Sequence, residues 1–555
     1  MKWAQLYGAW DGDSLNNSNS MVLAARIFVL VLIFVFAGTA PCFAASCEGL
    51  ANLKLAETTI TSAEVVGAGK LTLNGDVDAE GAAALRSLPE FCRVTAEVKP
   101  AKDSDIKLEV WMPVSGWNGK FGGLGNGGFA GTVNYEGLIG ALKLGFAVAS
   151  TDTGHQGSPI DSSWAPGHPE KVVDFGYRAI HEMTTQAKAI VQAFYGDAPK
   201  RSYFTGCSNG GRQALMEAQR YPEDYDGVVA GAPANNWTHL LAAGIWDLQA
   251  MQGNPAAYIP TSKVPALSAA VLAACDAKDG VSDGIVNDPR ECHFDPATML
   301  CKGEDSNSCL TAPQVAGLKK LYEGMRSSKG EKLFPERVAG GEDGGGGWPA
   351  WVTGRGPGKS LQYAFSVGFF ANIVFENKDW DFRTFNFDSD VKLVDEKEGA
   401  ILNANNPDLK RFEERGGKLI LFHGWSDAAI QPLSTIDYYN AVAHKMGKSE
   451  TERFVRLFMA PGMHHCSGGP GPNSFGQEEN APTDPQHNLY RALERWVEKG
   501  VAPDKIIATK YKNDDRPAEG VKMTRPLCAY PQVANYLGHG DTNDQANFVC
   551  GAEKK

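Results

Sequence analysis

Positive charge is scarce in this chain relative to negative charge. Its 555 residues include 53 lysines and arginines against 65 aspartates and glutamates, a formal net charge of -12 at pH 7. Nucleic acid and anionic membranes would be repelled by much of such a surface. We therefore expect neither as the main partner and favour a neutral or small ligand.

Long hydrophobic runs are also scarce. The one membrane-grade stretch, residues 26–37, is short for a spanning helix and precedes small residues around Ala44 and Ala45. We interpret residues 1–44 as a leader with a cleaved signal peptide, which predicts a secreted or periplasmic protein without a membrane anchor. The alternatives are an uncleaved anchor, a lipoprotein modified at Cys42, and a true start at Met21.

The rest of the composition gives no sign of disorder. Hydrophobic residues make up 43% of the chain and charged residues 21%, as in ordinary globular proteins. The length predicts about two to four structural units, one of which can be a large α/β domain.

The cysteines predict disulfides. Without Cys42 an even number remains in an exported chain, where thiols oxidise. Proximity in the sequence suggests the pairs Cys47–Cys92, Cys275–Cys292, Cys301–Cys309 and Cys528–Cys550. Cys207 and Cys466 are then left for each other, although spacing alone does not fix connectivity.

A nucleophile motif lies in the first half of the chain. Residues 206–210 read Gly-Cys-Ser-Asn-Gly, between a β-branched and aromatic run that starts at Arg201 and a run of helix formers that stops at Pro222. A serine in such a strand–turn–helix context is typical of a nucleophile elbow, which predicts Ser208 as the nucleophile. The alternative is a glycine-rich turn that contains a serine by chance.

The elements around this motif predict an α/β fold. Apolar strands at residues 107–114, 145–150, 227–231, 418–422 and 453–458 alternate with amphipathic helices. Between the third and fourth of them lies a long region of different character. We predict a core in two parts, residues 45–236 and 412–555, with an inserted lid domain at residues 237–411.

Two returning strands end in an acid and a base. Asp427 follows the first and His465 the second, so the order Ser208, Asp427, His465 is that of an α/β-hydrolase triad. His465 would take the serine proton, and Asp427 would orient the imidazole. His423 and His464 are rivals for the base. Asp152 and His155 form an earlier acid and base pair, for which we favour a turn-forming role.

A glycine-rich loop after a strand, residues 122–128, lacks the lysine and the helix context of nucleotide-binding motifs. In a serine hydrolase it can place a backbone N–H beside the nucleophile and complete an oxyanion hole with the N–H of Asn209. A flexible connector is the alternative.

An aspartate-rich loop occupies residues 275–289. Carboxylates with intervening backbone carbonyls are the ligands that Ca²⁺ takes, although the spacing is not that of an EF-hand. An acidic surface turn is the alternative, but aspartates this close repel each other unless a cation lies among them.

Taken together, the Gly-Cys-Ser-Asn-Gly-Gly motif, Asp427, His465-Cys466 and the aspartate-rich loop resemble the tannase and feruloyl esterase family over nearly the whole mature chain. The resemblance implies an α/β-hydrolase core, a triad of Ser208, Asp427 and His465, and a Cys207–Cys466 disulfide. It further implies an oxyanion hole from Asn209 with a glycine such as Gly127 or Gly128, and a structural Ca²⁺ in the lid. The ligands of that ion would be Asp276, Asp279, Val281, Asp283 and Ile285.

We therefore predict an esterase for small-molecule esters of aromatic carboxylic acids, feruloyl, galloyl or similar, acting through an acyl-enzyme. The alternatives are a serine peptidase or lipase of the same fold and a catalytically silent binding protein for aromatic glycosides. A flat pocket wall is expected from lid aromatics, and the candidates are Trp348, Trp351, Phe369 and Phe370. Each of them can instead belong to the lid core.

Overall fold

The computed structural model describes residues 44–73, 79–477 and 481–552. The predicted leader therefore lies outside the described residues, apart from its last position. Within the described ranges, no helix has both the length and the apolarity that crossing a membrane requires.

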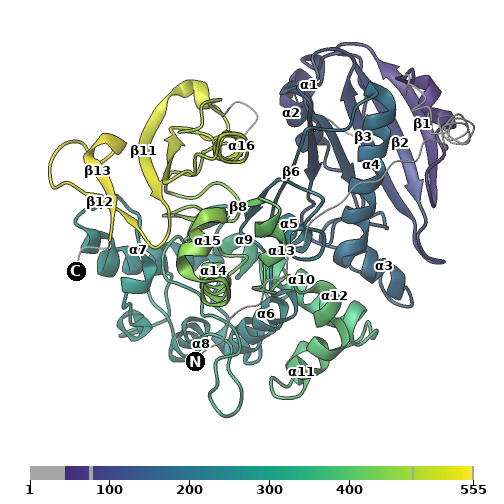
Figure 1. Ribbon diagram of the computed structural model, residues 1–555. Helices are drawn as coiled ribbons and strands as arrows, with labels where there is room; N and C mark the ends of the chain where they lie inside the picture. The colour runs from purple at the N-terminus through teal and green to yellow at the C-terminus, as the bar shows by residue number, and fades with distance from the viewer. Residues whose placement is uncertain (1–43, 74–78, 478–480, 553–555) are drawn as a thin grey trace, which may run out of the picture. The chain divides into compact units, whose positions relative to one another are not determined.

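A nine-stranded sheet forms the centre of the described chain, with the order β1-β2-β3-β5-β4-β6-β7-β8-β9. Strands β5, β4, β6, β7, β8 and β9 pair in parallel, whereas β1, β2 and β3 extend the sheet in antiparallel fashion next to β5. Figure 1 shows this progression as a change of colour from purple β1 to green β8. The strands are β1 (Thr58–Val66), β2 (Phe91–Val98), β3 (Ile106–Pro113), β4 (Lys120–Leu124), β5 (Ala147–Thr151), β6 (Arg201–Cys207), β7 (Gly227–Gly231), β8 (Lys418–Gly424) and β9 (Val455–Ala460).

Helices connect the parallel strands, so the predicted α/β class is confirmed. Each residue of β7 is buried, as expected for a central parallel strand covered on both faces. Apolar residues at helical spacing, such as Met183, Ala187 and Ile190, form the buried face of α4. The helices are α1 (Ala79–Arg86), α2 (Tyr135–Lys143), α3 (Pro169–Val173), α4 (Ala179–Tyr195), α5 (Asn209–Arg220), α6 (Trp237–Gln252), α7 (Val264–Cys275), α8 (Ala312–Glu323), α9 (Trp348–Trp351), α10 (Leu361–Gly368), α11 (Asp390–Val394), α12 (Ala400–Leu402), α13 (Lys410–Glu414), α14 (Pro432–Met446), α15 (Lys448–Phe454) and α16 (Leu489–Lys499).

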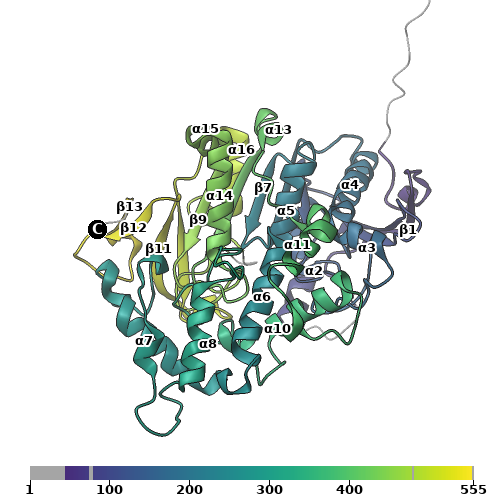
Figure 2. The same cartoon turned by 90° about the horizontal axis from the view of Figure 1, so that it is seen from below.

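The segment for which the sequence predicted a lid domain, residues 237–411, is called the lid; it contains α6 to α12 and the start of α13, and it separates β7 from β8 in the sequence. Its helix α6 packs against both α8 and α10, and the three helices lie side by side in Figure 2. Two clusters of buried apolar residues, one around Trp237 and one around Leu318, consist mainly of lid residues. The lid thus supplies much of its own core while it stays joined to the sheet at both ends.

Two small sheets follow the parallel core and were not anticipated from the sequence. Strands β10 (Lys505–Tyr511) and β11 (Val521–Cys528) form one antiparallel pair, and β12 (Val533–Tyr536) and β13 (Phe548–Gly551) form the other. They form the yellow, carboxyl-terminal part of the ribbon in Figure 1.

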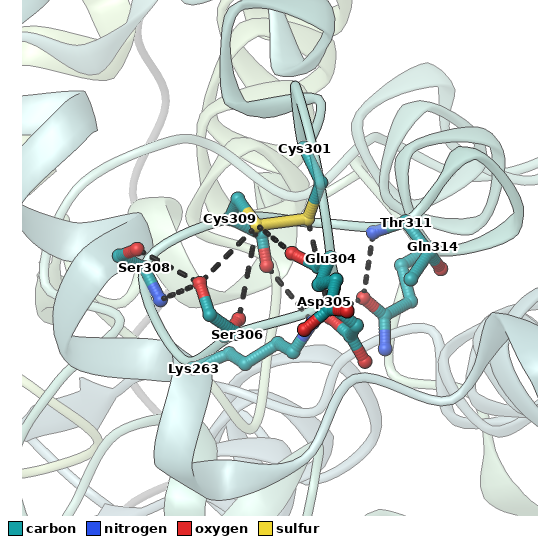
Figure 3. The surroundings of a disulfide bond; sticks show 9 residues. All are labelled: Lys263, Cys301, Glu304, Asp305, Ser306, Ser308, Cys309, Thr311 and Gln314. Atoms are coloured by element: carbon teal, nitrogen blue, oxygen red, sulfur yellow. Dashed lines mark hydrogen bonds and ion pairs between the residues drawn. A yellow bond between two sulfur atoms is a disulfide. The ribbon is translucent and has the colours of Figure 1, made fainter.

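Five disulfides link described cysteines, and all five predicted pairings are confirmed. Figure 3 shows one of them, Cys301–Cys309, where the buried ammonium of Lys263 donates hydrogen bonds to the Cys309 carbonyl and to Gln314, each over 2.9 Å, and pairs with Asp305. Lys263 therefore joins the short loop to α8, and the disulfide closes the loop itself. The pairs are Cys47–Cys92, Cys207–Cys466, Cys275–Cys292, Cys301–Cys309 and Cys528–Cys550.

Candidate active site

Ser208 lies in the turn between β6 and α5. Its φ of +66° belongs to the left-handed region, which a non-glycine residue adopts only where the surroundings enforce it. A side chain at Gly206 would come within 2.5 Å of the Gly210 backbone, and one at Gly211 within 2.3 Å of the Gly231 carbonyl. The glycines therefore permit the tight elbow that holds the serine at the end of the strand.

The glycine-rich loop after β4 lies next to this elbow. The backbone N–H of Asn126 donates to the side chain of Gln213 on α5 over 2.9 Å, which fixes the loop to the helix. Gly127 and Gly128 line the same cavity as Ser208. The loop and the serine therefore face the same cavity.

Asn209 is the first residue of α5, so its backbone N–H has no acceptor within the helix. Its side-chain oxygen accepts a hydrogen bond from Nε of Arg212 over 2.8 Å. The guanidinium of Arg212 is fully buried and binds three backbone carbonyls from other segments. This network fixes the start of the helix that follows the serine.

Asp427 and His465 form a hydrogen-bonded pair. Nδ1 of His465 donates to Oδ2 of Asp427 over 2.7 Å, while Oδ1 of Asp427 accepts from the backbone N–H groups of Ala429 and Ile430. Burial alone would raise the pKa of Asp427, but the adjacent imidazoles of His465 and His423 outweigh it and lower the pKa far below its ordinary value. The carboxylate stays ionised and fixes the ring of His465.

The rival histidines have other contacts. His423 is fully buried, with Nε2 3.1 Å from Oδ2 of Asp427 and Nδ1 2.7 Å from the hydroxyl of Thr435. Nε2 of His464 lies 3.0 Å from the Gly341 carbonyl, and burial lowers the pKa of His464. Of the three histidines, His465 lines the cavity that contains Ser208.

Asp152 and His155 serve the backbone, as expected. Asp152 accepts hydrogen bonds from the backbone of Lys107 and Gly154, which stabilises the turn after β5. His155 contacts the Phe129 carbonyl over 2.8 Å, and burial lowers its pKa to about 4. His155 is therefore a neutral histidine that packs in the core and binds the backbone there.

The cavity beside Ser208 and His465 has a volume of about 370 Å³ and mostly apolar walls. Trp351 lies edge-on to His465, with ring centroids 5.2 Å apart, and stacks at 5.8 Å with Phe365. Residues from the lid and from the segments at or after the ends of β4, β5, β6, β7, β8 and β9 complete it. The lining residues are Gly127, Gly128, Pro159, Ile160, Cys207, Ser208, Ala234, Trp237, Leu240, Leu241, Gly244, Trp351, Leu361, Gln362, Phe365, Ser366, Ala429, Ile430, Gln431, His465 and Cys466.

The four predicted pocket aromatics divide between the cavity and the lid core. Trp351 is a wall residue. Trp348 is instead 4% exposed and packs in the cluster around α7 and α8. Phe369 and Phe370 are fully buried and pack edge-on to each other at 5.0 Å, because they follow α10 on the side that faces the lid interior. These three residues therefore belong to the lid core.

The sequence and the structure both match known esterases. A family model described as "Tannase and feruloyl esterase" covers residues 92–551. An uncharacterized esterase of Xanthomonas campestris pv. campestris is 42% identical over 535 residues, 91% of each chain. A probable feruloyl esterase B-2 of Aspergillus flavus is 35% identical over 81% of this chain and 85% of its own. A crystal structure of feruloyl esterase B from Aspergillus oryzae matches with a TM-score of 0.82 and 30% identity over 91% of this chain and 99% of its own.

The chain belongs to the tannase and feruloyl esterase family. It is a carboxylic ester hydrolase with an α/β-hydrolase core, as the resemblance implied.

The loop for which this family implies calcium has a suitable donor set. Asp276 and Asp279 bind backbone N–H groups within the loop, and Oδ2 of Asp283 accepts from Arg525 over 2.8 Å. Burial and the neighbouring carboxylates raise the pKa of Asp279 to about 6. The side chains of Val281 and Ile285 are buried, so backbone carbonyls are the groups that these residues can offer. The oxygen donors and the unfavourable environment of Asp279 fit a hard cation such as Ca²⁺.

Three residues of the site, His423, Trp237 and Phe365, are not predicted from the sequence in the places that the structure gives them. The sequence marks His423 only as a rival base, although its position at a strand end, four residues before Asp427, is a usable signal. Trp237 and Phe365 line the cavity but had no distinguishing pattern, because lid aromatics are numerous and nothing in the sequence separates wall from core.

Proposed function

We propose that the protein is a serine esterase that forms an acyl-enzyme on Ser208. One observation carries this proposal: Ser208 and His465 line the same cavity, and His465 is oriented by the buried carboxylate of Asp427. In this arrangement Nδ1 of the imidazole is occupied by the carboxylate, which leaves Nε2 for the serine proton.

The reaction follows from these positions. Oγ of Ser208 attacks the ester carbonyl while His465 accepts its proton, and the same proton then passes to the departing alcohol. Water releases the acid by the reverse sequence. The negative oxygen of each tetrahedral intermediate is stabilised by the backbone N–H of Asn209 and by that of Gly127 or Gly128.

The substrates proposed are small-molecule esters of aromatic carboxylic acids such as feruloyl or galloyl esters. The aromatic rings of Trp237, Trp351 and Phe365 among the apolar cavity walls suit a flat acyl group. The named relatives include feruloyl esterases, which is consistent with this choice. The net negative charge favours such neutral ligands over nucleic acid.

We further propose that the aspartate-rich loop holds a structural Ca²⁺ through the carboxylates of Asp276, Asp279 and Asp283 and the backbone carbonyls of Val281 and Ile285. The ion would neutralise the crowded carboxylates and fix the loop between the Cys275–Cys292 disulfide and Arg525. Its role is structural, since these residues are separate from those that line the cavity.

Export from the cytoplasm is the third part of the proposal. Five disulfides among the described residues persist best in an oxidising compartment, and the signal-like segment at residues 26–37 provides a route to it. A secreted or periplasmic location without a membrane anchor follows. Sequencing the amino terminus of the mature protein tests the expected cleavage before Ala45.

The decisive test of the function combines Ser208→Ala with an active-site serine reagent. We expect wild-type enzyme to hydrolyse one or more of methyl gallate, methyl ferulate and a terephthalate monoester, and the reagent to label Ser208. Ser208→Ala should lose several orders of magnitude in kcat while its melting temperature is retained. Turnover by Ser208→Ala would refute the nucleophile, and a wild-type protein that binds these esters without cleaving them would be a silent binding protein.

A further inference from the structure

A second polar cluster lies at the opposite end of the helix that begins after the nucleophile. His181 on α4, Glu217 on α5 and Asp224 in the turn before β7 each place a ligand atom within 4.8 Å of the other two. Nδ1 of His181 lies 2.7 Å from Oδ2 of Asp224. One imidazole nitrogen and two carboxylates therefore converge on one point.

Glu217 has no partner for its charge in this cluster. Its side chain is 1% exposed, and neither carboxylate oxygen accepts a hydrogen bond from a donor group among the described residues; the one polar side chain in hydrogen-bonding contact is the carboxyl of Asp224. A buried carboxylate without a partner costs several kcal/mol unless a proton or a cation compensates it, by an order-of-magnitude argument. Burial, the charge of Asp224 and a hydrogen bond with the Asp224 carboxyl raise the pKa of Glu217 well above its ordinary value.

The nearby ammonium of Lys188 does not provide this compensation. Its Nζ donates to the backbone carbonyl of Asp224 and lies 5.2 Å above the ring of Tyr225. It contributes positive potential to Glu217 without a direct hydrogen bond.

The other two residues of the cluster, His181 and Asp224, are held in place and are accessible to solvent. The ring of His181 stacks on Tyr221, with centroids 3.8 Å apart and planes 7° from parallel. The side chains of His181 and Asp224 are 32% and 15% exposed, so an ion can enter from solvent.

We propose that His181, Glu217 and Asp224 bind a divalent transition-metal ion, with Zn²⁺ as the best fit. Nδ1 of His181 and one oxygen of each carboxylate supply three ligands, and water at the exposed side supplies the fourth. The imidazole distinguishes this site from one for Ca²⁺ or Mg²⁺, which prefer oxygen ligands throughout.

The site is remote from the esterase chemistry. Strands β6 and β7 are parallel, Ser208 follows the end of β6, and Asp224 precedes the start of β7, so the two sites lie at opposite edges of the sheet. Along α5, Glu217 is nine residues beyond Ser208, about 13 Å of helix. The ion would join the carboxyl end of α5 to α4, and its effect should be on stability.

The test measures Zn²⁺ binding by titration calorimetry and by metal analysis after gel filtration, using full-length protein stripped with EDTA and returned to Ca²⁺. We expect one Zn²⁺ per chain at this site and a rise in melting temperature. His181→Phe keeps the stacking on Tyr221 but removes the nitrogen ligand, and Glu217→Gln keeps shape but removes the charge. Each should weaken Zn²⁺ binding by about tenfold or more.

A matched control is available. Nδ1 of His168 lies 3.0 Å from Asp103 in a histidine–aspartate pair like that of His181 and Asp224, so His168→Phe should leave Zn²⁺ binding unchanged. Equal Zn²⁺ binding by wild type, His181→Phe and Glu217→Gln would overturn the proposal. So would a higher melting temperature of Glu217→Gln without any response to Zn²⁺, since Glu217 would then carry a proton in place of an ion. If Glu217→Gln does not fold, His181→Phe alone decides.

Discussion

The carboxylate of Asp427 accepts hydrogen bonds from four groups: two backbone N–H groups and the imidazoles of His465 and His423. An oxygen shared by two imidazoles is held more rigidly than one that binds the proposed base, His465, alone. His423 does not line the cavity and acts through Asp427, which makes it a positioning residue. Its second nitrogen, bound to Thr435, fixes the ring in turn.

We therefore expect His423→Leu to lower kcat by about tenfold to a hundredfold with little change in KM, because a small displacement of the base is costly in the transition state. His423→Gln retains an N–H donor and should recover part of the loss. Steady-state kinetics on one aromatic ester check both. Equal loss in the two variants, or a rise in KM alone, would contradict the positioning role.

Arg212 shows how a buried charge can organise backbone. Its guanidinium is enclosed by the carbonyls of Phe175, Gly176 and Leu402 and by the side chain of Asn209. Burial lowers the pKa of Arg212 to about 9, since no carboxylate is among these hydrogen-bond partners. The residue joins α5, the segment before α4 and the end of the lid.

Arg212→Met should lower the free energy of unfolding by about 3 kcal/mol or more, because several buried carbonyls lose their donor. Arg220→Met, at the exposed end of the same helix, is the control and should cost about 0.5 kcal/mol or less. Urea unfolding at pH 7 measures both. Similar small losses would mean that water replaces the guanidinium.

At the residue scale, the sequence predicted those site residues that directly follow an apolar strand. Ser208, Asp427 and His465 each follow an apolar strand, and parallel strands end at one edge of the sheet, so their convergence could be expected. Arg212 carries no such mark, because an arginine on an amphipathic helix is ordinarily exposed. Its burial depends on segments almost two hundred residues away in the sequence, such as Leu402.

At the scale of elements, most parallel strands were predictable, whereas β3 was the one antiparallel addition that the sequence predicted. Strands β7 and β8 are continuous apolar runs, which is the pattern of a sheet buried on both faces. By contrast, β1 has mixed partial exposure and β12 has four half-buried residues. Such edge strands depend on their partners more than on their own composition.

The Cys207–Cys466 disulfide joins two of these elements. It connects the end of β6 to the loop after β9 across 259 positions, and each cysteine is the neighbour of a proposed triad residue. In the loop-entropy model such a closure stabilises the fold by about 5 kcal/mol, although measured values are often smaller.

We expect Cys207→Ala with Cys466→Ala to lower both the melting temperature and kcat. The loss in kcat can reach about a hundredfold, since a misplacement of about 1 Å between nucleophile and base has that effect. Rates should be measured well below the new melting temperature, with Cys301→Ala and Cys309→Ala as the matched pair that removes a remote disulfide. If the first double variant keeps wild-type kcat, the disulfide serves stability alone.

At the scale of the whole molecule, binding and stabilising features are separated. The cavity lies between the carboxyl edge of the parallel strands and the lid, whereas the aspartate-rich loop belongs to the lid and is fixed to the β10–β11 sheet by Arg525. This contact links residues 242 positions apart, so a calcium ion there would stabilise the joint between the lid and the carboxyl-terminal sheet.

Chelation should therefore affect stability before chemistry. We expect EDTA to lower the melting temperature by about 3 to 5 °C, the shift that corresponds to an ion present at about a hundred times its Kd, while kcat at 25 °C stays within about twofold. Asp279→Asn should reproduce the loss and respond little to EDTA, because one carboxylate ligand is gone. Asp295→Asn retains a cap on a short turn elsewhere in the lid and should behave as wild type. A structural ion can affect the activity of Ser208 only through the folding of the lid. Immediate loss of activity on chelation at an unchanged melting temperature would therefore require the ion to act at the ester.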